Sequence, residues 1–169
     1  ILDDDNFLRS VAEFNFKKTH FPEAIDIFKQ LHDRNKNNAE ILEKIGYAYQ
    51  KQKKYEEALE YYLKAELLET NRLWLIKKIA FCYRKLENYE KSLEYYLMAE
   101  KSKPEDAYIL ANIGHNYLQI KDYENALKSA LKLPGEIVLS DRVRQKIREV
   151  ENRIAALEPT FKNPTVSLR

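Results

Sequence analysis

The side chains that could carry chemistry in this sequence are few and widely spaced. His20, His32 and His115 lack metal-ligand spacing with one another or with Cys82. The three glycines are isolated, so no glycine-rich loop can hold a phosphate. The carboxylates are scattered, and nothing pairs two of them in an apolar setting for acid–base catalysis. The sequence therefore predicts a protein that is not an enzyme, with no catalytic residue, metal or cofactor. We expect Cys82 to be a buried structural thiol.

The composition limits the class of partner. The chain has 169 residues, of which 33% are charged, but its formal net charge is only +2. This balance predicts no general attraction to nucleic acid or to acidic membranes, and no apolar run reaches the roughly 18 residues of a membrane span. The lone cysteine excludes an internal disulfide and favours a cytoplasmic location. Because the sequence begins with Ile1 rather than methionine, we expect a fragment or processed product, whose compartment stays open.

The elements that would position any functional side chains come from a repeat of 34 residues. Small residues recur at Ala12, Gly46, Ala80 and Gly114, and again at Ala24, Ala58, Ser92 and Ala126. Aromatic residues recur at Phe21, Tyr55, Tyr89 and Tyr123, and then at Phe28, Tyr62 and Tyr96, where the last repeat has Ala130. Four repeats in one register, without an insertion, argue against an irregular helical bundle with accidental periodicity.

Each repeat predicts two antiparallel helices. In the second repeat, Leu42, Ile45, Gly46 and Tyr49 fall on one helical face, and a similar pattern follows the short break at "QKK". We expect the two helices to approach most closely at Gly46 and Ala58, where a larger side chain would force the backbones apart. The tyrosines should fill the neighbouring volume and keep their hydroxyls near solvent. One helical pair cannot bury its apolar face alone, so the units must stack.

These motifs resemble the tetratricopeptide repeat family. The third repeat matches closely, with Ile76, Ile79, Ala80, Tyr83, Ser92, Tyr96, Ala99 and Pro104, whereas the first departs at Asn15 and the fourth at Ala130. The resemblance implies an all-α, right-handed superhelical solenoid of four helix-turn-helix units, at 5–38, 39–72, 73–106 and 107–133. It also implies a non-catalytic scaffold for protein–protein interaction.

A further helix is predicted at residues 140–158, with an apolar stripe formed by Val143, Ile147, Val150, Ile154 and Leu157. This helix could cap the last repeat, as the end of a solenoid requires. Its three-four spacing is also that of a coiled-coil seam, which would join two chains in a homodimer. We favour the cap. The tail at residues 159–169, interrupted by proline, is expected to be loosely ordered.

The family resemblance also indicates where a ligand would bind. In this family the first helix of each unit lines the concave surface, which here implies ten peptide-binding residues: Tyr47, Gln50, Lys51, Trp74, Lys77, Phe81, Arg84, Lys85, Tyr108 and His115. Clusters of exposed aromatic and arginine side chains are typical of interaction hot spots. Alternatively, Trp74 packs between units and the cations are ordinary solvated charges.

Two functional hypotheses follow. The preferred one is a scaffold that binds a peptide or protein segment, with apolar and acidic residues, in the concave groove. The alternative is a self-association or spacer module of a larger protein, which uses the C-terminal helix.

Overall fold

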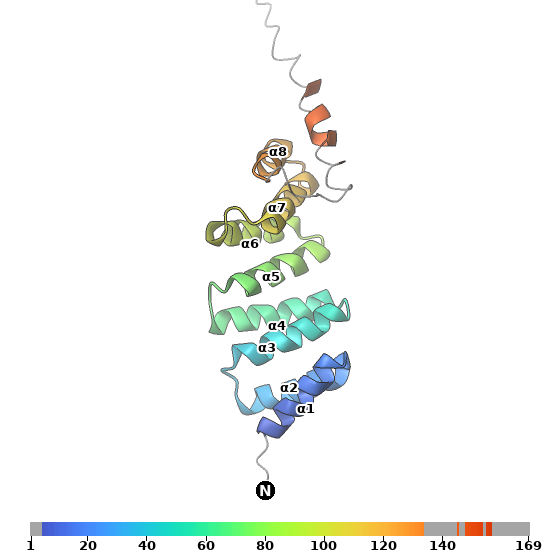
Figure 1. The fold of residues 1–169 in the computed structure, drawn as a ribbon, viewed down its shortest axis with the longest axis vertical. Coiled ribbons are helices and arrows are strands. Elements are labelled where there is room, and N and C mark those ends of the chain that lie inside the picture. The colour runs from blue at the N-terminus through green and yellow to red at the C-terminus, as the bar shows by residue number, and fades with distance from the viewer. Residues whose placement is uncertain (1–4, 134–144, 146–147, 154, 157–169) are drawn as a thin grey trace, which may run out of the picture. The chain divides into compact units, whose positions relative to one another are not determined.

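The computed structural model describes residues 5–133, 145, 148–153 and 155–156, and within these residues it contains helices and no strand. The eight helices are α1 (Asp5–Lys17), α2 (Phe21–Arg34), α3 (Ala39–Lys51), α4 (Tyr55–Leu68), α5 (Leu73–Lys85), α6 (Tyr89–Ser102), α7 (Ala107–Gln119) and α8 (Tyr123–Leu131), shown in Figure 1. Residues 145, 148–153 and 155–156 are also helical. The rest of the predicted helix at 140–158, and the tail at 159–169, lie outside the described residues.

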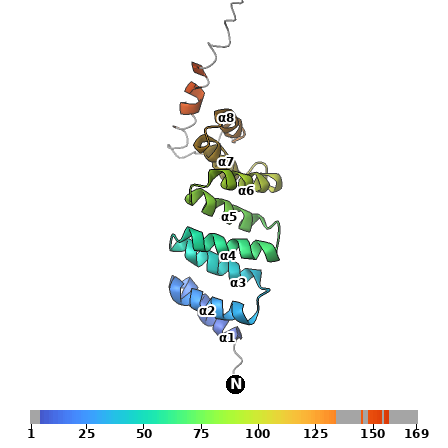
Figure 2. The same ribbon diagram turned by 180° about the vertical axis from the view of Figure 1, so that it is seen from behind.

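The helices pack with their neighbours in the chain. The chain forms two compact units, Ile1–Tyr95 and Tyr96–Arg169, which divide within α6. In the first unit, α1 packs on α2 and α3 packs on α4 (Figures 1 and 2). These pairs are joined because α2 also contacts α3, and α4 also contacts α5. In the second unit α7 packs on α8.

The predicted close approach of helices at Gly46 is confirmed. Gly46 and the small residues Ala58 and Ala65 are fully or almost fully buried. A Cβ atom added at Gly46 would lie 2.8 Å from the Cδ1 and Cε1 atoms of Tyr62 and 3.2 Å from the carbonyl oxygen of Ala58. At Gly114 the nearest such atom, the Cβ of Ser129, is 3.6 Å away. The fourth repeat is therefore less tightly packed at this position than the second.

The expectation that the tyrosine hydroxyls lie near solvent is wrong for the second aromatic position of the repeat. Tyr62 and Tyr96 are both 0% exposed. The Tyr62 hydroxyl donates a hydrogen bond of 2.9 Å to the Oε1 atom of Gln50, and the Tyr96 hydroxyl lies 3.2 Å from that of Tyr108. The Tyr62 ring lies against Gly46 of α3 and Trp74 of α5, so its hydroxyl needs a partner within the protein. Burial raises the pKa of Tyr62 above its usual value.

The turn within each helical hairpin has the same geometry four times. Thr19, Lys53, Glu87 and Lys121 all have φ between 59° and 65°, in the left-handed region. The amide of the next residue donates to the carbonyl five residues earlier, as His20 does to Asn15 at 2.9 Å and Lys54 to Tyr49 at 3.0 Å. These are Schellman motifs, which usually place glycine at the left-handed position. Here none of the four residues is glycine.

Candidate functional site

The first helices of the repeats bring several aromatic side chains together in the first compact unit. Phe16, Glu40, Glu43, Lys44, Tyr47 and Trp74 line a hollow of ≈ 450 Å³. Within it, the ring centroids of Phe16 and Tyr47 are 5.6 Å apart. Trp74 packs edge-on against the Tyr62 ring at 5.9 Å, yet it remains 42% exposed. Trp74 therefore packs against a residue of the preceding repeat and also keeps part of its surface exposed; its role in binding stays a prediction.

Ion pairs neutralise one side of this hollow. The Lys44 ammonium lies 2.7 Å from Glu13 and 3.7 Å from Glu40, and Arg9 lies 3.3 Å from Glu40. Because these charges satisfy one another, this part of the surface has little charge left for a ligand.

A buried carboxylate lies at the edge of the same hollow. Glu43 is 7% exposed and accepts a hydrogen bond from Arg72. Burial raises the pKa of Glu43 above its usual value, and the positive charge of Arg72 opposes this effect.

Cations also stack on aromatic rings along α3 and α5. We call this group of residues the cation–aromatic cluster; its members are Tyr47, Trp74, Phe81, Lys51, Lys78, Arg84 and Lys85. Lys51 lies 5.1 Å from the Tyr47 ring centroid, and Lys78 lies 4.8 Å from that of Tyr47 and 5.4 Å from that of Trp74. Arg84 and Lys85 lie 5.5 and 5.6 Å from the Phe81 ring centroid.

The four cations of this cluster have aromatic neighbours but no acidic ones. No carboxylate in the described part of the chain lies within ion-pair distance of them. The Nε atom of Arg84 is buried and has no hydrogen-bond acceptor among the described residues. Burial lowers the pKa of Lys78, although the nearby Tyr47 hydroxyl opposes this effect. The cluster thus holds partly desolvated positive charge that an anionic group could neutralise.

Lys78 is the residue that sequence reasoning missed, since the family pattern points to Lys77 instead. The repeat itself contained a signal. Lys44, which lies 34 residues earlier, occupies the same position in the preceding repeat and lies 5.9 Å from the centroid of the Phe16 ring. Lysine at this register in two successive repeats is the signal, since each of these lysines lies over an aromatic ring on the first helix of the preceding repeat.

The other predicted site residues have varied surroundings. The side-chain oxygen of Gln50 accepts a hydrogen bond from the Tyr62 hydroxyl, so this oxygen already has a partner within the protein. Lys77 is half-buried on α5. Tyr108 and His115 belong to the second compact unit, where Tyr108 is 46% exposed and packs edge-on against Tyr96 at 6.1 Å. A role of these residues in binding stays a prediction.

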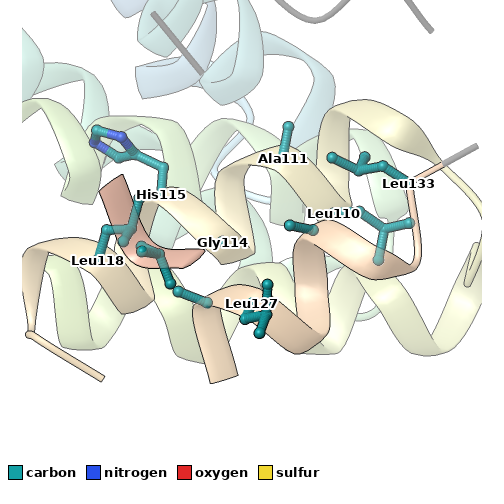
Figure 3. A pocket seen from close by; sticks show the side chains of 10 residues that line it. Leu110, Ala111, Gly114, His115, Leu118, Leu127 and Leu133 are labelled. Atoms are coloured by element: carbon teal, nitrogen blue, oxygen red, sulfur yellow. The ribbon is translucent and has the colours of Figure 1, made fainter. Parts of the chain in front are cut away.

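The second unit contains an apolar hollow of its own between α7 and α8. It is lined by Leu110, Ala111, Gly114, His115, Leu118, Ala126, Leu127, Ala130, Leu133 and Val150, most of which are labelled in Figure 3. Ala130 stands where the earlier repeats have Phe28, Tyr62 and Tyr96, and Gly114 corresponds to Gly46. The hollow therefore occupies the place of the missing aromatic ring.

The described part of the C-terminal segment packs against this second unit. Val150 is only 3% exposed at the hollow, and Arg153 stacks 4.7 Å from the Tyr123 ring centroid and donates a hydrogen bond to its hydroxyl. The other four residues of the proposed seam, Val143, Ile147, Ile154 and Leu157, lie outside the described residues. Since its own chain covers Val150, this residue has little surface left for a second chain.

Two of the chemical groups considered from the sequence, a metal site and the Cys82 thiol, can be assessed in the part of the chain that the structure describes. No group of three histidine, cysteine, aspartate or glutamate side chains could hold a metal ion there. Cys82 is 0% exposed, and burial raises the pKa of its thiol to about 12, so little reactive thiolate forms near neutral pH. Among the described residues, no helix has the length and apolar character that crossing a bilayer requires.

Known proteins share this architecture. The family model described as tetratricopeptide repeat matches residues 39–72, and a second model of the same description matches 78–106 and 107–133; together they cover more than half of the chain. No curated protein sequence matches.

Solved structures match at low sequence identity. MamA residues 41 to the end from Desulfovibrio magneticus RS-1 has 18% identity and a TM-score of 0.75, covering 95% of this chain and 98% of that one. MamA of AMB-1 has 14% identity and a TM-score of 0.79, with coverage of 94% and 88%. A tetratricopeptide repeat protein from Parabacteroides merdae has 22% identity and a TM-score of 0.74, with coverage of 92% and 67%. These likenesses establish the helical solenoid fold. From its repeats and its fold, the chain belongs to the tetratricopeptide repeat family, whose members generally act as non-catalytic scaffolds for protein–protein interaction.

Proposed function

We propose that this scaffold captures an extended peptide segment, which carries both apolar and acidic side chains, at the cation–aromatic cluster. The observation that carries the proposal is the set of four cations stacked on Tyr47, Trp74 and Phe81 without a carboxylate partner among the described residues. Acidic side chains of the ligand would supply the missing partners. The exposed edge of Trp74 and the neighbouring hollow would bury an apolar side chain.

The same geometry disfavours cationic ligands. Exposed aromatic rings can bind ammonium and guanidinium groups through their faces. Here the protein's own lysine and arginine side chains already lie over the rings of Tyr47, Trp74 and Phe81. A basic peptide would have to displace them and would meet their charges, so we expect discrimination by sign of charge.

The binding test uses Trp74, the only tryptophan in the chain, as an intrinsic fluorescent probe. The probe peptide is a twelve-residue chain that alternates leucine or phenylalanine with glutamate, and the comparison peptide has lysine in place of every glutamate. We expect the acidic peptide alone to change the Trp74 emission in a saturable way. Its affinity should fall as salt rises from about 50 to 500 mM, because salt screens the partly exposed charges.

Two charge variants determine whether the cluster is responsible. Arg84→Glu should weaken binding of the acidic peptide by about 10- to 100-fold, the range expected when a charge-assisted hydrogen bond worth ~1.5–3 kcal/mol is lost. Lys103→Glu changes the net charge equally at an exposed loop position between α6 and α7, and should leave the affinity unchanged. Equal binding of the acidic and basic peptides, or equal losses in the two variants, would refute the proposed site.

The self-association hypothesis remains the second candidate for the C-terminal helix. Sedimentation velocity over a range of protein concentrations tests it independently of the peptide titration. A monomer at every concentration would count against a seam through that helix.

A further inference from the structure

The second repeat provides an internal comparison for Lys78. Lys44 stands 34 residues before Lys78, at the same position of the repeat, and both side chains are half-buried. The ammonium group of Lys44 lies 2.7 Å from the carboxylate of Glu13 and 3.7 Å from that of Glu40. Two negative charges of the chain itself therefore compensate the charge of Lys44.

Aromatic rings replace both of these carboxylates around Lys78. Tyr47 and Trp74 stand 34 residues after Glu13 and Glu40. The Lys78 ammonium lies 4.8 Å from the Tyr47 ring centroid and 5.4 Å from that of Trp74. A ring attracts a cation through its quadrupole, but it has no net charge with which to neutralise it. Among the described residues, no carboxylate takes the place that Glu13 and Glu40 take beside Lys44.

A second ammonium group lies over the same tyrosine. Lys51 is 5.1 Å from the Tyr47 ring centroid. Burial lowers the pKa of Lys78, and the positive charge of Lys51 adds to this effect, although Tyr47 opposes it. Two negative charges close to the Tyr47 ring would compensate both ammonium groups.

We propose that the group bound by Lys51 and Lys78 is a phosphate monoester, so that the captured peptide carries a phosphorylated serine or threonine. This inference rests on the proposed function, because it names the acidic group of the captured peptide. A phosphate monoester has a charge of about −1.5 to −2 at pH 7 and three acceptor oxygens, whereas a glutamate side chain has a single charge. One phosphate thus supplies the negative charge that Glu13 and Glu40 together supply to Lys44.

The hollow beside the two lysines selects a peptide rather than a free anion. Tyr47 and Trp74 both line this hollow of ≈ 450 Å³, and Trp74 is 42% exposed. An apolar side chain next to the phosphorylated residue would bury surface against these rings. Inorganic phosphate has no such group and should bind far more weakly.

The test compares four peptides by titration calorimetry in a buffer without phosphate. The first is the acidic peptide of the fluorescence test. The second has phosphoserine in place of one central glutamate, the third has serine there, and the fourth is the acidic peptide with one additional glutamate, which equals the phosphopeptide in net charge. We expect the phosphopeptide to bind about tenfold more tightly than either glutamate peptide, the gain from one further charge-assisted hydrogen bond. The serine peptide should bind most weakly.

Lysine variants show whether the two ammonium groups produce this advantage. Lys78→Met removes the charge but keeps an unbranched side chain over the rings, and Lys51→Gln alters an exposed side chain with little effect on folding. Each should reduce the tenfold advantage to about twofold or less. Lys64→Gln is the matched control, since Lys64 lies in an exposed ion pair with Glu60, and it should leave the advantage unchanged.

The pH dependence of the advantage identifies the dianion. The second pKa of a phosphate monoester is about 6, so the advantage should be complete at pH 7.5 and fall to about twofold at pH 5. The titratable and charged groups around this site are Tyr47 and Lys51 of α3, Tyr62 of α4, Lys77 and Cys82 of α5, and Glu43 with Arg72. Glu43, whose pKa burial raises, acts on both peptides, so the ratio of their affinities removes its contribution.

The outcomes separate this inference from the proposed function. If the equal-charge glutamate peptide binds as tightly as the phosphopeptide, only total charge matters; the inference then fails and the proposed function survives. An advantage that persists at pH 5 or in Lys78→Met would also overturn the inference. Competition by inorganic phosphate at the same concentration as the phosphopeptide would assign the site to the free anion instead. Absence of binding by all four peptides would overturn both proposals.

Discussion

Replacing Gly46 with alanine tests the packing on which the repeat depends. Alanine gains about 1 kcal/mol over glycine in a helix interior. At Gly46 the added methyl group would lie 2.8 Å from two ring atoms of Tyr62, a distance that real side chains essentially never adopt. The Tyr62 ring cannot move away easily, because it is fully buried and its hydroxyl is bonded to Gln50. Overpacking of this kind costs ~1–3 kcal/mol, so we expect Gly46→Ala to be destabilising by about 1 kcal/mol.

Gly114 provides the matched control, since it occupies the same position two repeats later. A methyl group there would meet its nearest neighbours at 3.6 and 3.7 Å, which are ordinary contact distances. Gly114→Ala should therefore stabilise the chain by up to about 1 kcal/mol, through helix propensity alone. The two substitutions are chemically identical, yet their effects on the free energy of unfolding should have opposite signs.

Urea unfolding measures both effects. Circular dichroism follows the whole chain, and Trp74 fluorescence reports on the region near Gly46, because Trp74 packs edge-on against Tyr62. A double-mutant cycle isolates the cause: in a Tyr62→Leu background, where the ring is absent, Gly46→Ala should become neutral or stabilising. If Gly46→Ala stabilises the unmodified chain, or if its cost persists without the Tyr62 ring, the packing argument is refuted.

Three further predictions concern single residues. Thr19→Gly should raise the free energy of unfolding by about 1 kcal/mol in urea titrations, because a β-branched residue at φ 63° is strained and glycine is not; an unchanged midpoint would contradict this. Cys82, whose thiol has a pKa of about 12, should react with a disulfide reagent at pH 8 only after urea unfolds the chain, and stoichiometric labelling of the folded protein would show that it is accessible. The raised pKa of Glu43 means that the folded chain holds this proton more tightly than the unfolded chain, so the free energy of unfolding should fall as the pH rises from 4.5 through that raised pKa. Glu43→Gln should flatten this decline, and an unaltered pH profile would assign the decline to other groups.

The helical repeat architecture could be predicted from the sequence because small residues that recur every 34 residues indicate positions where helices approach closely. Gly46, Ala58 and Ala65 recur in register, and each is buried where helices meet. The position of the tyrosine hydroxyls could not be predicted in the same way. Whether a hydroxyl reaches solvent depends on the next helix of the stack, and the Tyr62 ring lies beneath Trp74 of α5.

The candidate site was only partly visible in the sequence. The family pattern assigns residues to the concave surface one at a time, and it selected every member of the cation–aromatic cluster except Lys78. It passed over Lys78, whose long side chain reaches the Tyr47 ring on the preceding first helix. Contacts between helices of adjacent repeats depend on side-chain length and direction, which periodicity alone does not specify.

The recurrence of one turn geometry at Thr19, Lys53, Glu87 and Lys121 has a consequence for how such a chain can change over evolutionary time. A duplication or deletion that runs from one of these turns to the next joins two equivalent turns. The helices on either side then keep their register in the 34-residue repeat. The number of hairpins can therefore grow or shrink in a single genetic event, while each surviving hairpin keeps its own closure.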